Sequence, residues 1–165
     1  MFSLKQLANI GRSARQPDLK NAHSSPPARE PIRLVAITQN LEDAATLRKI
    51  ANSQGWQIEI VGSSAAALAS LKNEPAPLVI CDSELSGESW HDVLAKITGH
   101  PQAVCVLLAS RVADDYLWRQ VIRNQGYDIV VKPFQAEELR RSVTFAWSWR
   151  GWAYRHYAGL RKHTD

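Results

Sequence analysis

The segment Leu78-Val-Ile-Cys-Asp-Ser-Glu-Leu-Ser-Gly87 decides the fold of this chain. Four apolar residues run without a polar interruption into Asp82, and a loop containing serine and glycine follows. A short apolar run of this kind is typical of a strand that is buried on both faces of a parallel sheet. Open α/β sheets bind ligands outside the carboxyl ends of their strands. The segment therefore predicts an α/β protein that presents Asp82 at the functional edge of its sheet.

Two later segments show the same arrangement. Asp128-Ile-Val-Val-Lys-Pro-Phe134 is a short apolar strand that ends in Lys132, directly before a proline. Ala103-Val-Cys-Val-Leu-Leu-Ala-Ser110 is a third strand, and a hydroxyl stands at its end. A carboxylate, an ammonium and a hydroxyl at neighbouring strand ends are suited to binding or transferring a phosphoryl group.

Asp82, Ser110 and the triplet Lys132-Pro133-Phe134 resemble the phosphoacceptor aspartate, the switch hydroxyl and the Lys-Pro pair of response-regulator receiver domains. The resemblance covers about residues 33–149 and depends on order and spacing, with Lys132 placed 22 residues after Ser110. It implies a flavodoxin-like (CheY-like) five-stranded parallel sheet in the order 2-1-3-4-5, with helices on both faces. It also implies a cis Lys132–Pro133 peptide bond. In such a protein of bacterial two-component signalling, Asp82 accepts a phosphoryl group from a histidine kinase, and Lys132 and Ser110 contact that group.

The sequence departs from the receiver pattern at the metal site. The first strand is predicted over Ile32–Ile37, and Gly55 is expected to end the helix that follows it. Receiver domains carry two acidic residues at the end of this strand, and the spacing back from Gly55 places Thr38 and Gln39 at those positions. Mg²⁺ prefers carboxylate oxygens in octahedral geometry. We therefore expect no certain cofactor, and at most a weak Mg²⁺ site formed by Asp82 and Glu84. The chain is accordingly expected to be an atypical member of the family.

The first strand leads into a helix whose start is marked in the sequence. Asn40 is a suitable N-cap, and Glu42 and Asp43 fall in the first turn, where the helix dipole favours acidic residues. We do not expect these two acids to replace the missing pair.

Further along, the strand ending before Ser110 is predicted over Ala103–Leu108. A helix is predicted over residues 114–125 and is ended by Gly126. Its predicted sheet-facing stripe consists of four apolar residues, Leu117, Trp118, Val121 and Ile122. The last helix is predicted to start near Ala136, and either to leave the domain body near Arg150 or to break at Gly151.

The net charge of +4 is distributed unevenly along the chain. Residues 1–33 carry six Lys and Arg against two acids, residues 34–134 carry eight against eleven, and residues 135–165 carry six against three. We predict a disordered basic tail at residues 1–32, a receiver-like domain at 33–149, and a basic, aromatic, helical extension at 150–165. Because the body is mildly acidic, a general nucleic-acid surface is not expected. Stable membrane association is not expected either. We expect the protein to be located in the cytoplasm.

Aromatic residues form a second stripe on the last helix. Phe145, Trp149, Trp152 and His156 recur at helical spacing, and no part of the predicted sheet lies beneath them. The stripe is either packed back over the domain or is an interface for a partner or a second copy. One such arrangement is a homodimer through the fourth helix, predicted over residues 114–125, or through the fifth and last helix.

Three functions are compatible with these residues. The first, which is the function expected here, is a phosphorelay receiver that is phosphorylated on Asp82 and signals through protein contacts. The second is a pseudo-receiver, an interaction module whose contacts do not depend on phosphorylation. The third is a small enzyme or nucleic-acid binder on the same fold, but the chain has neither a phosphate-binding glycine loop nor a nucleophile elbow. We therefore expect a non-enzymatic protein that binds a histidine kinase or another signalling protein.

Overall fold

The computed structural model describes residues 30–160, with side chains described from residue 30 to residue 149. Strands and helices alternate along this part of the chain. The strands are β1 (Arg33–Ile37), β2 (Gln57–Val61), β3 (Leu78–Asp82), β4 (Cys105–Ser110) and β5 (Asp128–Val131). The helices are α1 (Leu41–Gln54), α2 (Ser64–Asn73), α3 (Trp90–Thr98), α4 (Asp115–Arg123) and α5 (Ala136–Leu160).

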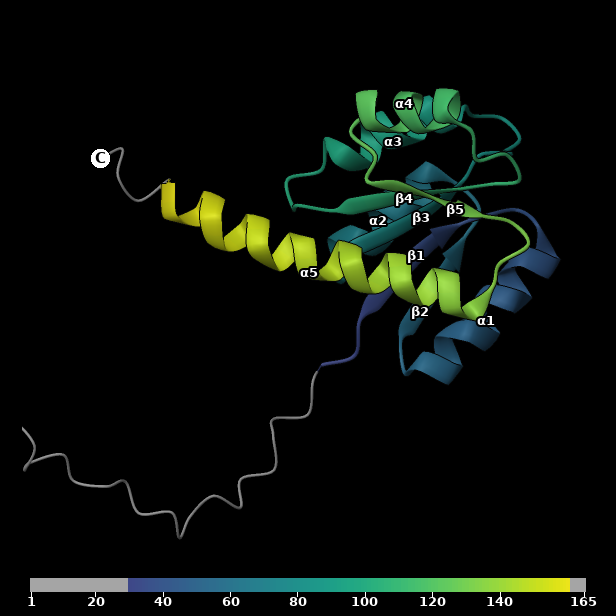
Figure 1. Ribbon diagram of the computed structural model, residues 1–165, viewed down its shortest axis with the longest axis horizontal. Helices are drawn as coiled ribbons and strands as arrows, with labels where there is room; N and C mark the ends of the chain where they lie inside the picture. The colour runs from purple at the N-terminus through teal and green to yellow at the C-terminus, as the bar shows by residue number, and fades with distance from the viewer. Residues whose placement is uncertain (1–29, 161–165) are drawn as a thin grey trace, which may run out of the picture. The chain divides into compact units, whose positions relative to one another are not determined.

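The strands form one parallel sheet in the order β2-β1-β3-β4-β5. Helices α1 and α5 cover one face, and α2, α3 and α4 cover the other (Figure 1). The predicted fold and strand order are confirmed. Since all strands are parallel, their carboxyl ends meet at one edge, and Asp82 and Ser110 are the last residues of β3 and β4.

The core consists of two apolar layers separated by the sheet. All five residues of β3 are buried, and successive side chains enter opposite layers. Leu78 and Ile80 face α1 and α5, whereas Val79 and Cys81 face the other three helices. A central strand buried on both sides cannot change register without moving apolar side chains between layers. The position of Asp82 at the sheet edge is therefore firmly fixed.

Helix α1 begins as the sequence predicts. The side chain of Asn40 accepts hydrogen bonds from the backbone N–H groups of Glu42 and Asp43, at 2.9 and 3.0 Å. The helix ends at Gly55, whose φ of +70° is a left-handed conformation that suits glycine. The cap fixes the first turn of α1 at the same edge of the sheet that carries Asp82.

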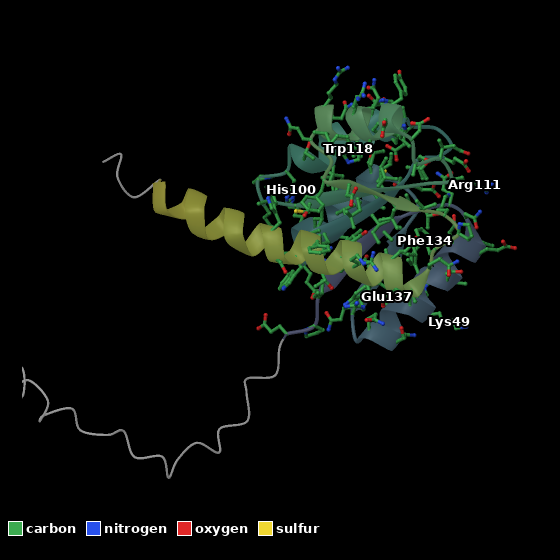
Figure 2. The ribbon with its side chains drawn as sticks, viewed as in Figure 1. Lys49, His100, Arg111, Trp118, Phe134 and Glu137 are labelled. Atoms are coloured by element: carbon green, nitrogen blue, oxygen red, sulfur yellow. The ribbon has the colours of Figure 1, made fainter. Side chains whose placement is uncertain are left out.

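The predicted inward face of α4 is wrong in part. Val121 is buried and Leu117 packs against the core, but Trp118 and Ile122 are 49% and 42% exposed (Figure 2). Residues 117 and 121 are aligned one turn apart, whereas residues 118 and 122 are turned about 100° away from them. The nine-residue α4 buries only this narrow stripe and leaves Tyr116, Trp118 and Ile122 largely in solvent.

Two predicted boundaries also differ from the structure. Strand β4 begins and ends two residues later than predicted, because its pairing with β3 starts at Cys105 opposite Leu78. Helix α5 does not break at Gly151, which was one of the two alternatives predicted for it, but continues to Leu160. A single glycine inside a helix costs only about 1 kcal/mol relative to alanine, which a long helix tolerates. The predicted tail lies outside the described residues, apart from residues 30–32.

Gly126 has a different role from the predicted one. Helix α4 ends at Arg123, and Gln125 takes the positive φ, of 65°. A Cβ atom on Gly126 would overlap with Val121 Cγ1 and would lie 3.1 Å from Leu94 Cδ2. Glycine is needed here because the turn into β5 passes directly against two buried side chains.

We predict that Gly126→Ala destabilises the domain, since the branched side chain of Val121 has no space to withdraw. The expected loss in the free energy of unfolding is about 1–3 kcal/mol, the usual cost of overpacking. Gly62→Ala is the matched control, because a Cβ there meets no atom within 4 Å. Denaturant unfolding of both variants checks the prediction, and equal stabilities would contradict it.

Candidate functional site

The carboxyl ends of β1, β3 and β5 bring a carboxylate, a hydroxyl and an ammonium together. The Asp82 side chain is 4% exposed, and both of its oxygens are hydrogen-bonded. Oδ1 accepts from Lys132 Nζ at 2.8 Å and from the backbone N–H of Glu84 at 3.0 Å. Oδ2 accepts from the hydroxyl of Thr38 at 2.9 Å. Asp82 is therefore a buried carboxylate that the protein itself satisfies.

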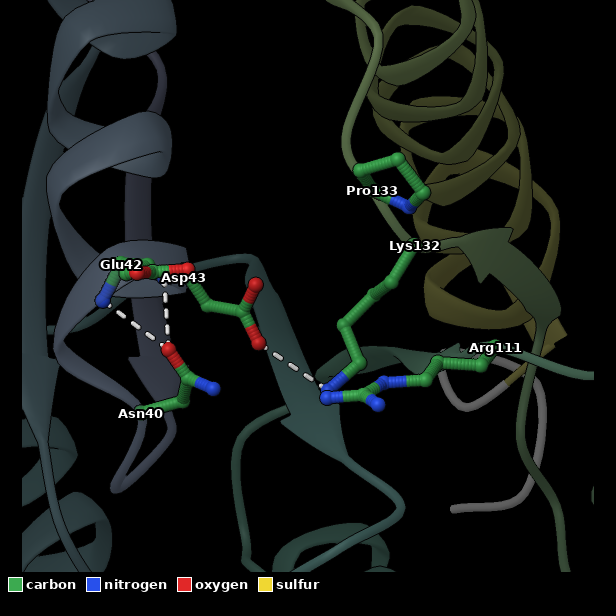
Figure 3. Close-up of a pocket in the computed structure, with 6 residues that line it drawn as sticks. All are labelled: Asn40, Glu42, Asp43, Arg111, Lys132 and Pro133. Atoms are coloured by element: carbon green, nitrogen blue, oxygen red, sulfur yellow. Dashed lines mark hydrogen bonds and ion pairs between the residues drawn. The ribbon is translucent and has the colours of Figure 1, made fainter.

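Lys132 bridges two carboxylates. Its side chain is 3% exposed, and its Nζ also lies 3.0 Å from Oδ2 of Asp43 (Figure 3). Burial disfavours the ammonium, but hydrogen bonds to Asp82 and Asp43, with their negative charges, outweigh that effect and raise the pKa of Lys132. The lysine therefore stays charged. The predicted cis Lys132–Pro133 peptide bond is present.

Asp43 is the site residue that the sequence analysis missed. The interpretation as a first-turn helix acid is correct, but its carboxylate also reaches across the sheet edge to Lys132, 89 residues away in the chain. Part of the evidence for this contact is present in the sequence. Asn40 caps α1 at the edge that holds Asp82, and Asp43 occupies the third position of that helix, close to the same edge. Only the tilt of α1 over the sheet decides that this acid meets the lysine.

Thr38 and Gln39 each have a structural role at the acidic-pair positions. Thr38 is buried, donates its hydroxyl hydrogen to Asp82 and accepts from the backbone N–H of Asn40 at 3.2 Å. Gln39 donates from Nε2 to the carbonyls of Gly62 and Ser86, and its Oε1 accepts from the N–H of Ser86 at 2.9 Å. Gln39 therefore holds the loops after β2 and β3 together.

The residues present do not fit Mg²⁺. No group of three or more His, Cys, Asp or Glu residues in the described part of the chain is arranged to hold a metal. The carboxylate of Glu84 is 57% exposed and faces Arg111 at 3.8 Å, so it does not join Asp82 as a ligand. The hydroxyl and amide that replace the acidic pair are neutral and are engaged with the protein. A hard dication needs more oxygen charge than this edge offers.

Ser110 lies at the predicted strand end, but its hydroxyl is used locally. Its Oγ accepts a hydrogen bond from the backbone N–H of Val112 at 3.1 Å, and the side chain is buried. Its backbone carbonyl accepts from the N–H of Lys132 at 2.9 Å. The structure thus brings Ser110 next to the lysine strand, without a described hydrogen bond from its hydroxyl to Asp82 or Lys132.

A pocket of about 320 Å³ opens beside the lysine. Its lining consists of Asn40, Glu42, Asp43, Arg111, Lys132 and Pro133 (Figure 3). Asp82 is not among these residues, because it lies beneath Lys132 and Thr38. Two carboxylates line the opening: that of Glu42, which is exposed, and that of Asp43, whose side chain is 17% exposed and which is paired with Lys132. An incoming group therefore meets Asp43 and the already paired Lys132 before it meets Asp82.

The loop after β3 is pinned at a second point. Glu88 accepts from the backbone N–H of Ser64 at 2.7 Å and from the Ser64 hydroxyl, and these bonds hold the pKa of the Glu88 carboxyl below its usual value.

Cys81, the residue before Asp82, is a buried thiol. Burial, with Asp82 and Glu88 nearby, raises the pKa of Cys81 to about 12, so this thiol stays protonated. It acts as a small apolar core residue.

The predicted aromatic stripe is partly described. Phe145 and Trp149 are 62% and 49% exposed, and the Trp149 ring lies 5.6 Å from that of Tyr127. Trp152 and His156 belong to the same helix, but their side chains lie outside the described ones.

Comparison with known proteins agrees with this architecture. The family model of the response regulator receiver domain matches residues 38–144. Chemotaxis response regulator CheY4 of Vibrio cholerae is 14% identical, with a TM-score of 0.65 over 70% of this chain and 98% of that one. A two-component response regulator from Clostridium difficile is 16% identical, with a TM-score of 0.64 over 70% and 95%. NtrX from Brucella abortus is 23% identical, with a TM-score of 0.70 over 81% and 30%. No curated protein sequence matches the chain.

We predict that Asp43→Asn lowers the free energy of unfolding by about 1–3 kcal/mol, because the buried Lys132 loses one of its two carboxylates. Glu42→Gln is the matched control: it removes the neighbouring first-turn acid, whose exposed carboxylate makes no described ion pair. Thermal or urea unfolding at neutral pH checks the pair. Equal losses in the two variants would show that the helix dipole, and not the ion pair, is responsible.

Proposed function

Because the chain belongs to the response-regulator receiver domain family, we propose that it is a receiver whose contacts with signalling partners do not depend on phosphorylation. Receiver domains act in two-component phosphorelay signalling and interact with histidine kinases and other signalling proteins. Of the functions considered from the sequence, this is the pseudo-receiver. It acts by binding and not by catalysis.

The observation that carries the proposal is the closed bonding of Asp82. Phosphoryl transfer to a carboxylate needs an accessible nucleophile, a metal to neutralise the phosphoryl oxygens and a free cation to bind them. Asp82 is 4% exposed, and Thr38 donates to the oxygen that Lys132 leaves unpaired. Lys132 itself is already held by Asp43 at 3.0 Å. The nucleophile is therefore buried, the cation is already paired, and the residues beside Asp82 form a poor metal site.

The same bonds supply a reason for retaining Asp82 and Lys132 without phosphorylation. A buried ion pair that loses one partner leaves an uncompensated charge, which costs about 3–5 kcal/mol. The bridge joins the ends of β3 and β5 to the first turn of α1. These residues thus hold the functional edge of the domain in one arrangement, and a partner meets a constant surface.

A second candidate, phosphorylation of Asp82, is favoured by one feature. Asp82 and Lys132 are 2.8 Å apart, and the strand end that carries Ser110 adjoins them. In this reaction an Asp82 oxygen forms a bond to the phosphorus of the donor, and the bond from that phosphorus to its leaving group breaks. It requires Lys132 to exchange Asp43 for a phosphoryl oxygen, and Thr38 to release Asp82.

We predict no Mg²⁺-dependent mass gain when the purified chain is incubated with a small acyl phosphate and analysed by intact-mass spectrometry. The restored variant Thr38→Asp/Gln39→Asp is expected to gain one phosphoryl group, because it regains the acidic pair and frees Asp82 from the Thr38 hydrogen bond. A receiver domain that carries both acids serves as the positive control for the donor.

Asp82→Asn supplies the site control for this experiment. A phosphoryl gain on the parent chain that needs Mg²⁺ and disappears in Asp82→Asn would overturn the proposal and establish the second candidate. A gain that persists in Asp82→Asn would instead reveal reaction elsewhere on the chain and would leave the proposal standing.

A further inference from the structure

The C-terminal half of α5 extends beyond the part of the helix that packs on the sheet. Leu139, Val143 and Ala146 are its buried residues, and Ala146 is the last of them among the described side chains. The helix continues for 14 more residues, to Leu160, which corresponds to roughly 21 Å of length. A helix stays folded at such length when another surface covers one of its faces.

The charge of this segment indicates what that surface carries. Between residues 139 and 164 the sequence has no Asp or Glu, and it has six cations: Arg140, Arg141, Arg150, Arg155, Arg161 and Lys162. The body of the domain, residues 34–134, has a net charge of −3. Like charges oppose pairing of this segment with a second copy of itself. An anionic surface would attract the segment and repel the domain body.

The helix also carries a largely apolar face over residues 145–160, which includes one histidine and no Lys or Arg. Positions 145, 149, 152, 156 and 160 share one face, roughly 100° from the sheet-facing stripe, and none of them is Lys or Arg. Phe145 and Trp149, the two members whose side chains are described, are 62% and 49% exposed. The positions of Arg150 and Arg155 lie on either side of this face, at roughly 100° and 120° from Trp149. Apolar centre and cationic flanks define an interfacial amphipathic helix.

The type of aromatic residue distinguishes a lipid surface from a protein groove. Five Trp and Tyr residues occur within eleven positions, namely Trp147, Trp149, Trp152, Tyr154 and Tyr157, and no Leu, Ile, Val or Met occurs between residues 144 and 159. A groove covers one stripe and would leave positions 147 and 154, on the opposite side, in water. Trp and Tyr are enriched at the headgroup level of a bilayer, where arginine side chains can also keep their charged ends in water.

We propose that residues 145–160 of α5 bind the surface of an anionic phospholipid bilayer, lying in the plane of the headgroups. No described helix is long and apolar enough to cross a membrane, so the attachment is peripheral. It is reversible and salt-sensitive, which agrees with the expectation that stable membrane association is absent. This inference uses other residues than the proposed function and stands or falls separately from it.

Sedimentation with vesicles tests the proposal on the full chain. The expected result is binding to vesicles of equal parts phosphatidylglycerol and phosphatidylcholine, weakening by about tenfold or more as salt is raised, and little binding to phosphatidylcholine alone. Arg150→Glu/Arg155→Glu is expected to weaken binding by about tenfold or more. Trp152→Ser, which leaves the charge unchanged, is expected to weaken it as well, because the apolar face is interrupted.

Arg48→Glu/Lys49→Glu is the matched control. These two cations are exposed on α1, and their reversal changes the net charge by the same amount (Lys49 is labelled in Figure 2). This control is expected to bind within about twofold of the parent, and circular dichroism establishes that each variant is folded. Absence of sedimentation with the anionic vesicles at low salt would overturn the proposal. So would equal weakening by the control, or retention on duplex DNA or an acidic protein without vesicle binding.

Discussion

The ammonium of Lys132, held between Asp82 and Asp43, is the interaction on which the arrangement of this domain's functional edge depends. The Lys132 side chain is only 3% exposed, and a charge buried in this way is tolerable only when it is paired and hydrogen-bonded; both carboxylates meet that need within 3.0 Å. The bridge connects β3, β5 and α1, which approach one another only at the carboxyl edge of the sheet. Thr38 and the backbone of Glu84 satisfy the rest of Asp82. The edge is therefore closed by the protein's own groups.

This closure gives each departure from the receiver pattern a physical role. Thr38 replaces a metal-binding charge with a hydroxyl that donates to Asp82, and Gln39 joins the loops after β2 and β3 through hydrogen bonds to Gly62 and Ser86. Asp43 supplies a negative charge to Lys132 from α1 rather than from the end of β1. The fold of a receiver is kept, and Thr38, Gln39 and Asp43 each make hydrogen bonds or ion pairs within the domain at this edge.

The sequence was sufficient for the fold and for most of this edge. Uninterrupted apolar runs identified the central strands, and Asn40 and Gly55 marked both ends of α1. Asp82 and Lys132 were found because each ends such a run. Asp43 was not found, because its contact depends on how α1 tilts over the sheet, which no local pattern encodes. Trp118 and Ile122 were assigned to the core because they are apolar and lie beside Leu117 and Val121 on the predicted helix. The assignment is wrong because α4 has more apolar positions than its short contact with the sheet can cover. Gly126 resembled a helix terminator, but close packing against Val121 is what requires it.

The residues at this edge leave no place for a divalent cation beside Asp82, because Thr38, Lys132 and the Glu84 backbone already bind its oxygens. Titration of the ¹⁵N-labelled chain with Mg²⁺, followed by amide chemical shifts, tests it most directly. We expect no saturable shift at Thr38, Asp43 or Asp82, and saturable shifts at the same sites in a variant that carries aspartate at positions 38 and 39. Saturable shifts around Asp82 in the parent chain at millimolar Mg²⁺ would contradict the account, because they would mean that the Thr38 and Lys132 bonds yield to the metal.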